Sequence, residues 1–338
     1  MNIRAKGRFC AVTLFLAVGI AVADNAVSPP PVKPLPQTAR KRNFIHDPST
    51  IVRYRDEYWV FATGQGIVSK RSKDLVKWEA GPCVFSTPPA WTAKVVPSNR
   101  GYFWAPDVIY LKDRFLLYYS VSKWGARTSA IGLATNPTLN PIDPNYHWTD
   151  LGVVIQTGND DNFNAIDPGV TQDADGNLWL VFGSFWSGIK LIQLDPSTGK
   201  RIAPDSPIYS LAYHSSIEAP CIYYNDGCYY LFVNWGLCCR GVNSTYNIRV
   251  GRSISITGPY IDKDGVDMLH DGGSPFLETK GRFIGPGHAA IFSQGGTNWL
   301  SYHYYDGNQG GAADLAIRRL QWSSDGWPEL CEAADFAK

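Results

Sequence analysis

The sequence predicts an all-β fold, and within this class a five-bladed β-propeller. Gly (32 residues), Pro (23 residues) and β-forming residues prevail in the 338-residue chain, and no segment has the period of an amphipathic helix. Five short segments recur from residue 44 onward: His46-Asp47-Pro48, Trp104-Ala105-Pro106, Ile166-Asp167-Pro168, Glu218-Ala219-Pro220 and Pro286-Gly287-His288. Their spacings are 58, 62, 52 and 68 residues, counted between Pro48, Pro106, Pro168, Pro220 and His288.

The same internal order follows each of these segments. A β-rich run, a turn and an aromatic strand are expected at 49–64, 107–122, 169–184, 221–236 and 289–305. The turns are Arg55-Asp56, Lys112-Asp113, Asp175-Gly176-Asn177, Asn225-Asp226-Gly227 and Gly295-Gly296. A third strand is expected at 66–74, 130–137, 189–196, 248–255 and 315–326. Three or four antiparallel strands repeated five times are typical of a propeller, whereas the alternative, a β-sandwich, would not repeat one order five times.

The N-terminal region has the pattern of a secretory signal followed by a linker. In residues 1–23, three basic side chains precede an apolar run, and Ala21-Val22-Ala23 is a cleavage site. The alternative is a transmembrane helix, but the apolar run has only about 14 residues, short of the roughly 20 that span a bilayer. Residues 24–40 are Pro-rich and predict an extended linker. We therefore expect a secreted protein whose residues 41–338 form one propeller domain.

Charge and aromatic content exclude several classes of protein. The formal net charge is +1, and removal of the signal leaves 28 basic and 30 acidic side chains, a net charge of −2. Such a chain lacks the positive field of a nucleic-acid binder, and we expect neither a nucleic-acid nor a membrane partner. An aromatic content of 13% excludes a disordered chain. The partner is expected to be uncharged, and the protein to be a monomer.

Six cysteines remain after the signal is removed: Cys83, Cys221, Cys228, Cys238, Cys239 and Cys331. An even number in an oxidising compartment predicts disulfides, although the sequence leaves their pairing open. Cys238 and Cys239 could bond to each other or to other cysteines.

Three acidic residues occupy equivalent positions of the repeat. Asp47 and Asp167 share one position, Glu218 lies one residue earlier, and His288 is aligned with the Pro position. The first strands of propeller blades line the axis, so we expect these side chains to converge. Each acid alone could be a turn or loop residue. Three acids that converge raise one another's pKa and cost stability, which favours a functional site.

Acids in an aromatic-rich pocket indicate glycoside hydrolysis. An inverting enzyme uses one carboxylic acid for the leaving oxygen and one carboxylate for water, roughly 6.5–9.5 Å apart. Aromatic rings stack on sugar faces, and Trp104, Trp124, Trp186 and Trp235 are expected near the axis. Core packing is the alternative, and it is the interpretation that we favour for the mid-strand residues Trp59, Trp179 and Trp299.

The order of these motifs resembles glycoside hydrolase family 43, a family of five-bladed propellers. The resemblance rests on His46-Asp47-Pro48-Ser49, Phe103-Trp104-Ala105-Pro106-Asp107, Ala165-Ile166-Asp167-Pro168, Gly183-Ser184-Phe185-Trp186-Ser187-Gly188 and Glu218-Ala219-Pro220. The segment Leu237-Cys238-Cys239-Arg240-Gly241, Ser244-Thr245-Tyr246 and Gly285-Pro286-Gly287-His288 resemble its arabinanase branch.

The resemblance implies endo-hydrolysis of α-1,5-linked L-arabinan and arabino-oligosaccharides with inversion of configuration. It makes Asp47 the general base, Glu218 the general acid, and Asp167 the residue that orients Glu218 and holds its pKa up. It places five residues in contact with substrate, namely His46, Trp104, Trp124, Asn164 and Ser184. It also implies that His288 reaches a metal ion on the propeller axis, often calcium, with water in the other positions. A packed structural histidine is the alternative for His288.

Three other functions stay open at this point. An exo-acting arabinofuranosidase or xylosidase of the same fold would need a pocket closed at one end. Exo release of short oligosaccharides is a variant that the sequence does not exclude. A propeller that only binds carbohydrate is the alternative outside the enzymes.

Overall fold

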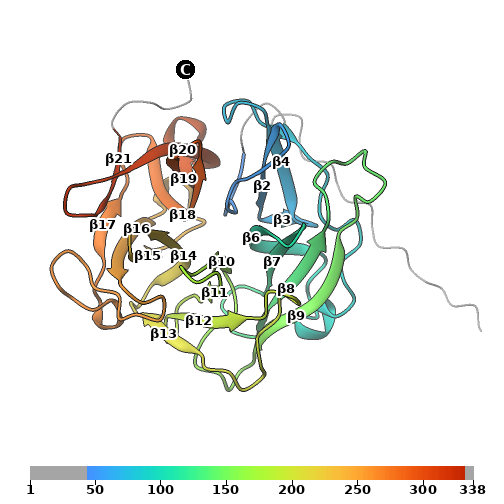
Figure 1. The fold of residues 1–338 in the computed structure, drawn as a ribbon, viewed down its shortest axis with the longest axis horizontal. Helices are drawn as coiled ribbons and strands as arrows, with labels where there is room; N and C mark the ends of the chain where they lie inside the picture. The colour runs from blue at the N-terminus through green and yellow to red at the C-terminus, as the bar shows by residue number, and fades with distance from the viewer. Residues whose placement is uncertain (1–43, 332–338) are drawn as a thin grey trace, which may run out of the picture. The chain divides into compact units, whose positions relative to one another are not determined.

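Five antiparallel sheets surround a common centre, and apart from one two-residue strand each is built from strands that follow one another in the chain (Figure 1). The computed structural model describes residues 44–331 and confirms the predicted five-bladed propeller. The predicted signal peptide (1–23) and linker (24–40) lie outside the described residues. In the described part, no helix is long and apolar enough to cross a membrane.

The strands of the first three blades have the following bounds. Blade 1 contains β1 (Val52–Tyr54), β2 (Glu57–Ala62), β4 (Val68–Ser72) and β5 (Glu79–Ala80). Blade 2 contains β6 (Tyr102–Leu111), β7 (Arg114–Val121), β8 (Ser129–Asn136) and β9 (Thr149–Thr157), with β3 (Gly64–Gln65) added beside β6. Blade 3 contains β10 (Gly169–Gln172), β11 (Leu178–Phe182), β12 (Ile189–Leu194) and β13 (Tyr209–Ala212).

The last two blades are built in the same order. Blade 4 contains β14 (Ile217–Asn225), β15 (Cys228–Trp235), β16 (Asn247–Ser253) and β17 (Ser274–Leu277). Blade 5 contains β18 (Phe283–Gln294), β19 (Thr297–Asp306), β20 (Ala312–Trp322) and β21 (Pro328–Leu330). The helices of the described part have a single turn each: α1 (Thr92–Val95), η2 (Gly241–Asn243), η3 (Met268–His270) and η4 (Gly307–Gln309).

The predicted turns join the first and second strands of all five blades. Three of them have two consecutive central residues with positive φ: Lys112-Asp113 (50° and 62°), Asp226-Gly227 (46° and 83°) and Gly295-Gly296 (58° and 75°). Positive φ at both central residues defines the hairpin turn whose twist matches that of the strands. Asp, Asn and Gly tolerate this region best, which explains why the sequence pattern located these hairpins correctly.

One apolar cluster lies at each of the five junctions between blades. Trp59 belongs to the cluster between blades 1 and 2, and Trp179 to the one between blades 3 and 4. Trp299 packs against the cluster that joins blade 5 to blade 1. These positions confirm that the three mid-strand tryptophans pack in the core. Burial of such rings, together with the aliphatic side chains around them, stabilises the junctions between blades.

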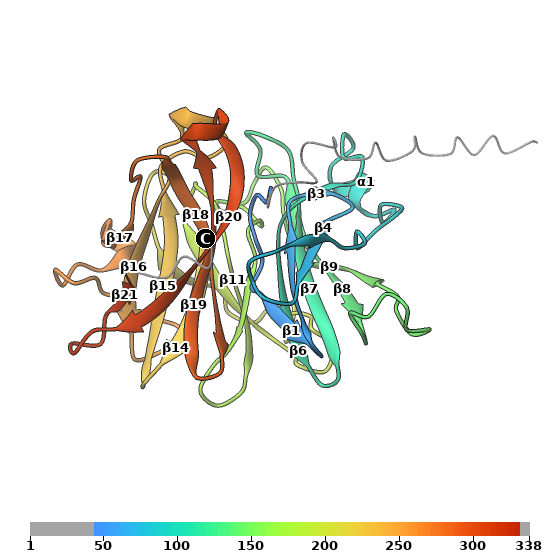
Figure 2. The same ribbon diagram turned by 90° about the horizontal axis from the view of Figure 1, so that it is seen from above.

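Side-chain packing closes the ring between the first and last blades. Ile45 and Ile51 of the first blade pack with Phe292, Leu315 and Ile317 of the last one, and the two blades share no strand. The first described strand, β1, lies beside β6 of the next blade (Figure 2).

The buried carboxylate of Asp107 links the first three blades. Its oxygens accept the N–H groups of Thr50 and Val170, each at 2.8 Å. Asp107 thus has a structural role, distinct from that of the acids described below.

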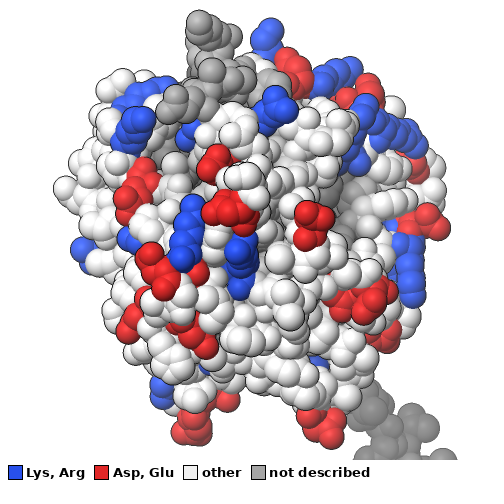
Figure 3. Space-filling model, turned by 60° about the vertical axis from the view of Figure 1, so that its left-hand side comes forward, with Lys and Arg blue, Asp and Glu red and all other residues white. Residues whose placement is uncertain are grey.

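Charged side chains of both signs are interspersed on the surface. The face seen in Figure 3 carries Lys and Arg next to Asp and Glu, without a large field of one sign. This mixture agrees with the near-zero net charge of the sequence. It gives no electrostatic reason for a highly charged partner to bind this face.

Candidate active site

Each blade places one residue with left-handed backbone at the same position near the centre. The φ angles are 52° for Asp47, 44° for Ala105, 57° for Asp167, 52° for Ala219 and 57° for His288. Non-glycine residues rarely adopt this region and, where they do, the strain often marks a functional site. His288 therefore occupies the position of Asp47 and Asp167. The sequence alignment of His288 with the Pro position was wrong by one residue, because blade 5 has Ala289 where each of the other four blades has a proline after the left-handed residue.

The N–H group of each of these five residues is held by a side chain. In four blades the acceptor belongs to the preceding blade, where it lies on the second strand or directly after the end of that strand. These bonds run from Asp47 to His303 (3.1 Å), from Ala105 to Thr63 (2.8 Å), from Asp167 to Ser120 (2.9 Å) and from His288 to Asn234 (2.9 Å). The corresponding residue of blade 3 is Gly183, which has no side chain. At that junction Asp167 Oδ2 accepts the N–H of Ala219 at 3.2 Å.

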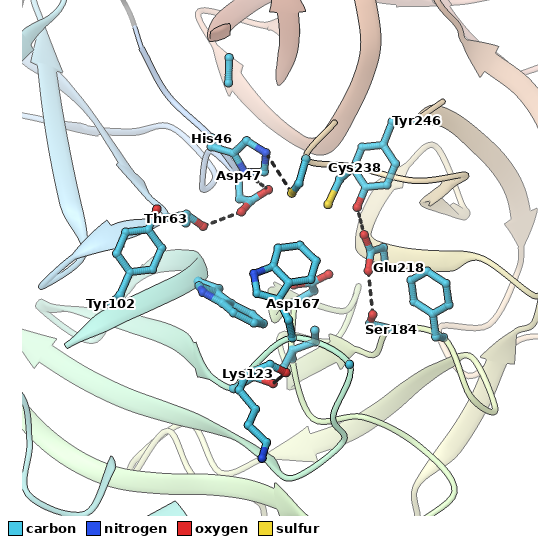
Figure 4. A pocket seen from close by; sticks show the side chains of 18 of the residues that line it. His46, Asp47, Thr63, Tyr102, Lys123, Asp167, Ser184, Glu218, Cys238 and Tyr246 are labelled. Atoms are coloured by element: carbon cyan, nitrogen blue, oxygen red, sulfur yellow. Dashed lines mark hydrogen bonds and ion pairs between the residues drawn. The ribbon is translucent and has the colours of Figure 1, made fainter. Parts of the chain in front are cut away.

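A cleft of about 880 Å³ opens over this ring, and the three predicted acids all line it (Figure 4). Asp167 and Glu218 are buried, with 8% and 9% of their surface exposed, and the side chain of Asp47 is 15% exposed. The structure thus brings together Asp47, Asp167 and Glu218 from three different blades. This convergence agrees with the prediction drawn from the repeat.

Glu218 accepts hydrogen bonds on both carboxyl oxygens. Ser184 Oγ donates to Oε2 at 2.7 Å, and the Tyr246 hydroxyl donates to Oε1 (Figure 4). Burial raises the pKa of Glu218, whereas the two hydrogen bonds act in the opposite direction and the charge of Asp47 adds to the increase. The net effect is a carboxyl group that keeps its proton to a higher pH than an exposed glutamate.

Asp167 is coupled to Glu218 through both charge and backbone. Burial raises the pKa of Asp167 well above its usual range, and the negative charges of Glu218 and Asp47 raise it further. Its bond to the N–H of Ala219 fixes the backbone directly beside Glu218. Two such carboxyl groups titrate as a pair, so the pair retains a proton where an isolated aspartate would be ionised.

Asp47 has the opposite electrostatic environment. Thr63 Oγ1 donates to its Oδ2 at 2.5 Å, and His46 Nδ1 lies 2.9 Å from Oδ1. Burial disfavours the charged carboxylate, but the imidazoles of His46, His288 and His303 outweigh burial and hold the pKa of Asp47 well below its usual range. Asp47 is therefore ionised at a pH at which the Asp167–Glu218 pair still holds a proton.

His46 is held in place on both of its ring nitrogens. Its Nε2 lies 2.8 Å from the Tyr305 hydroxyl, and its ring stacks on that of His303 at 4.1 Å. Burial disfavours the imidazolium, but the charge and hydrogen bond of Asp47 raise the pKa of His46 to about 10. His46 and Asp47 thus form an ion pair at one side of the cleft.

Aromatic side chains form much of the cleft wall. The rings of Trp104 and Trp124 lie 5.5 Å apart at 46°, and 74% of the surface of Trp124 is exposed. Trp186 also lines the cleft. Trp235 does not, so its prediction as a cleft residue was wrong: it stacks on His214 at 3.9 Å, outside the cleft.

Asn164 has an unused hydrogen-bond acceptor beside the acids. The residue lines the cleft and is 2% exposed, and its Oδ1 has no hydrogen-bond partner among the described residues. A buried acceptor without a partner is costly. A hydroxyl group in the cleft would satisfy it, which agrees with the predicted substrate contact.

The residues around His288 offer few ligands for a metal ion. His288 Nδ1 lies 3.6 Å from Asp47 Oδ1, and burial lowers the pKa of His288, which favours the neutral imidazole that binds metals. His46, Asp47 and His303 also lie within 4.8 Å of one another, but Nδ1 of His303 already accepts the N–H of Asp47. Calcium prefers six to eight oxygens, so water would have to supply most of its shell here.

Sequence reasoning gave no role to three residues that contact the acids or His46. Tyr246 stands in a motif that was recognised, but nothing in the local sequence indicated that its hydroxyl reaches Glu218. Thr63 occupies the same position of its blade as Ser120 and Asn234 do in theirs, so the repeat in the sequence could have pointed to it. Tyr305 contacts His46 from the far end of the chain.

The six cysteines of the described part are all free thiols. The predicted disulfide framework is therefore not present in the structure. Cys238 and Cys239 line the cleft, and Cys239 Sγ lies 3.6 Å from His46 Nε2.

A propeller whose aromatic cleft brings together an aspartate paired with a histidine and two buried carboxyl groups that retain a proton has the groups that a glycoside hydrolase needs. Residues 41–328 match the profile of Glycosyl hydrolases family 43. The chain belongs to this family.

Its relatives are named as arabinan-degrading enzymes. The chain is 43% identical over 292 residues to an extracellular endo-alpha-(1->5)-L-arabinanase of Bacillus subtilis, over 84% of this chain and 87% of that protein. It is 42% identical over 301 residues to an extracellular exo-alpha-(1->5)-L-arabinofuranosidase of Cellvibrio japonicus, over 85% of this chain and 86% of that protein. The structure of an endo-arabinanase from Bacillus licheniformis matches with a TM-score of 0.79 and 45% identity, covering 85% of this chain and 97% of that one.

Proposed function

We propose that this protein is a secreted, monomeric endo-arabinanase that hydrolyses internal α-1,5-L-arabinofuranosyl linkages with inversion of configuration. The observation that carries the proposal is the convergence of three acids in one aromatic cleft, where His46 lies 2.9 Å from Asp47 while Asp167 and Glu218 are buried without a cationic partner among the described residues. An inverting glycosidase needs one ionised base and one protonated acid at the same pH. The arabinan-degrading relatives support the choice of sugar, and their names as extracellular proteins support secretion.

In this proposal each acid has one task. Asp47 accepts a proton from the water that attacks the anomeric carbon, and Glu218 donates its proton to the leaving glycosidic oxygen. Asp167 orients Glu218 through Ala219 and shares its proton. His46, Ser184, Asn164 and the tryptophans of the wall contact the sugar units.

Product analysis over time tests the endo mode. A cleft of about 880 Å³ has room for several sugar rings, and the endo-arabinanase relatives favour cutting within the polymer. We expect a rapid fall in the viscosity of debranched arabinan and a mixture of oligosaccharides from the start. Single sugars or one short oligosaccharide from the first minutes would instead support the exo mode of the Cellvibrio japonicus relative. Binding without product would leave only the carbohydrate-binding function.

The metal ion at His288 stays a prediction. His288 would supply one ligand and water the others, and no catalytic step depends on the ion in our proposal. Elemental analysis of the purified protein and of the His288→Ala variant would test it, with calcium expected in the first and absent from the second.

The Tyr246→Phe variant is expected to remain active at higher pH than the parent enzyme. Glu218 must be protonated to act, so kcat/KM falls as the pH rises through the pKa of the acid pair. The Tyr246 hydroxyl stabilises the charged form, and its removal should raise this pKa and move the alkaline limb to higher pH. Tyr119→Phe is the matched control, because Tyr119 donates to Asp150 at 2.7 Å outside the cleft. An unchanged or acid-shifted limb in Tyr246→Phe would contradict the assignment.

A further inference from the structure

The loop between β11 and β12 carries three side chains of the cleft wall in a strained conformation. Ser184, Phe185 and Trp186 all line the cleft. The φ angles of Phe185 and Trp186 are 53° and 42°, and two glycines with φ of 130° and 78°, Gly183 and Gly188, flank the segment. Two consecutive aromatic residues with left-handed backbone persist only if their surroundings hold them there.

Backbone hydrogen bonds fix part of this loop. Phe185 N donates to Ile217 O at 2.7 Å, and Gly188 N donates to Phe185 O at 2.7 Å. Ser187 N donates to Asn162 O at 3.0 Å. The carbonyl oxygen of Ser187 needs a partner from elsewhere in the blade.

Lys190 supplies that partner from inside the protein. It lies on β12 and is only 5% exposed, and its Nζ donates to Ser187 O at 2.7 Å and to Ser210 Oγ at 2.9 Å. Lys190 forms no ion pair among the described residues. A buried ammonium group without a carboxylate is costly, so packing alone would favour an apolar side chain. Charge-assisted hydrogen bonds are the stronger kind, and here one of them ends on the strained loop.

We propose that Lys190 is a positioning residue that holds the Ser184–Ser187 loop in its left-handed conformation. Through this loop it keeps Ser184 Oγ on Glu218 and the Phe185 and Trp186 rings in the cleft wall. Its effect on turnover rests on the proposed function, whereas its effect on the loop does not.

The same blade contains a matched lysine that does not touch the cleft. Lys200 Nζ donates to Gly152 O and Val153 O, each at 2.7 Å. It is less buried than Lys190 but, like it, has two oxygen acceptors. Lys200→Met controls for the general cost of removing such a lysine.

Hydrogen exchange and steady-state kinetics on the full chain test the proposal together. In Lys190→Met we expect faster exchange in the peptide that covers residues 183–188, while the other blades are unchanged. We also expect KM for debranched arabinan to rise and kcat to fall, with a total loss in kcat/KM of about tenfold to a hundredfold. Lys190→Arg keeps a charged donor and should restore both readouts in part. Lys200→Met should change neither.

The proposal would be overturned if the loop of folded Lys190→Met exchanged as slowly as that of the parent. It would also be overturned if Lys200→Met changed loop exchange and kcat/KM as much as Lys190→Met does. If Lys190→Met does not fold, Lys190→Gln takes its place. Its uncharged and shorter side chain removes the charge-assisted bond to Ser187 O, so the same faster exchange is expected, and slow exchange would overturn the proposal. A parent enzyme that does not hydrolyse arabinan would contradict the proposed function, while the exchange comparison would still decide the role of Lys190.

Discussion

Replacement of Glu218 by Gln is expected to lower kcat/KM on arabinan by about 10²- to 10⁴-fold, the usual contribution of a general acid. Gln keeps the size of the side chain but cannot donate a proton to the leaving oxygen. On an aryl glycoside of an arabino-oligosaccharide the loss should be much smaller, because a nitrophenolate leaves without protonation. Initial rates of Glu218→Gln and the parent on the two substrates measure the difference.

The matched control for this variant is Asp107→Asn. Asp107 is also a buried carboxyl group, but it holds the N–H groups of Thr50 and Val170 and does not line the cleft. Asp107→Asn should lower the midpoint of thermal unfolding and change the rates on the two substrates to the same extent. An equal loss on both substrates in Glu218→Gln would exclude Glu218 as the acid.

Replacement of Asp47 by Asn should lower activity on both substrates alike, again by about 10²- to 10⁴-fold. The attack of water is common to the two reactions, and an amide cannot accept its proton. Azide, a nucleophile that needs no base, should restore part of the activity on the aryl substrate by displacing the aryl oxide. Rates with and without azide test this, and the anomeric configuration of the glycosyl azide reports inversion.

Asp150→Asn is the matched control for Asp47→Asn. Asp150 accepts hydrogen bonds from Tyr119 and Trp91 outside the cleft. Its replacement should leave the rates nearly unchanged, and azide should have no effect. Near-parental activity of Asp47→Asn without azide would show that another group acts as the base.

Most of the fold could be predicted from the sequence, because turns and strands are specified by residues that are close together in the chain. Pairs such as Lys112-Asp113 and Gly295-Gly296 specify the hairpin turns by their backbone preferences, and the aromatic strands follow at fixed distances. The recurrence of this order five times then led to the propeller. The one-residue error at His288 arose because blade 5 lacks the proline that follows the left-handed residue in the other four blades and has Ala289 there instead.

The repeat in the sequence was enough to predict that the three acids converge. A fixed order of strands in every blade brings the same position of each blade to the centre, so the acids could be found by counting along the chain. Their protonation and orientation depend instead on contacts that form when the blades pack together. The low pKa of Asp47 is due first to the adjacent His46, which Tyr305 and His303 hold in place from more than 200 residues away, and less to His288 and His303. Glu218 receives its hydrogen bonds from Ser184 and Tyr246, which lie on either side of it in the chain. Burial and charge depend on distances in space, and these distances follow from the packing of all five blades.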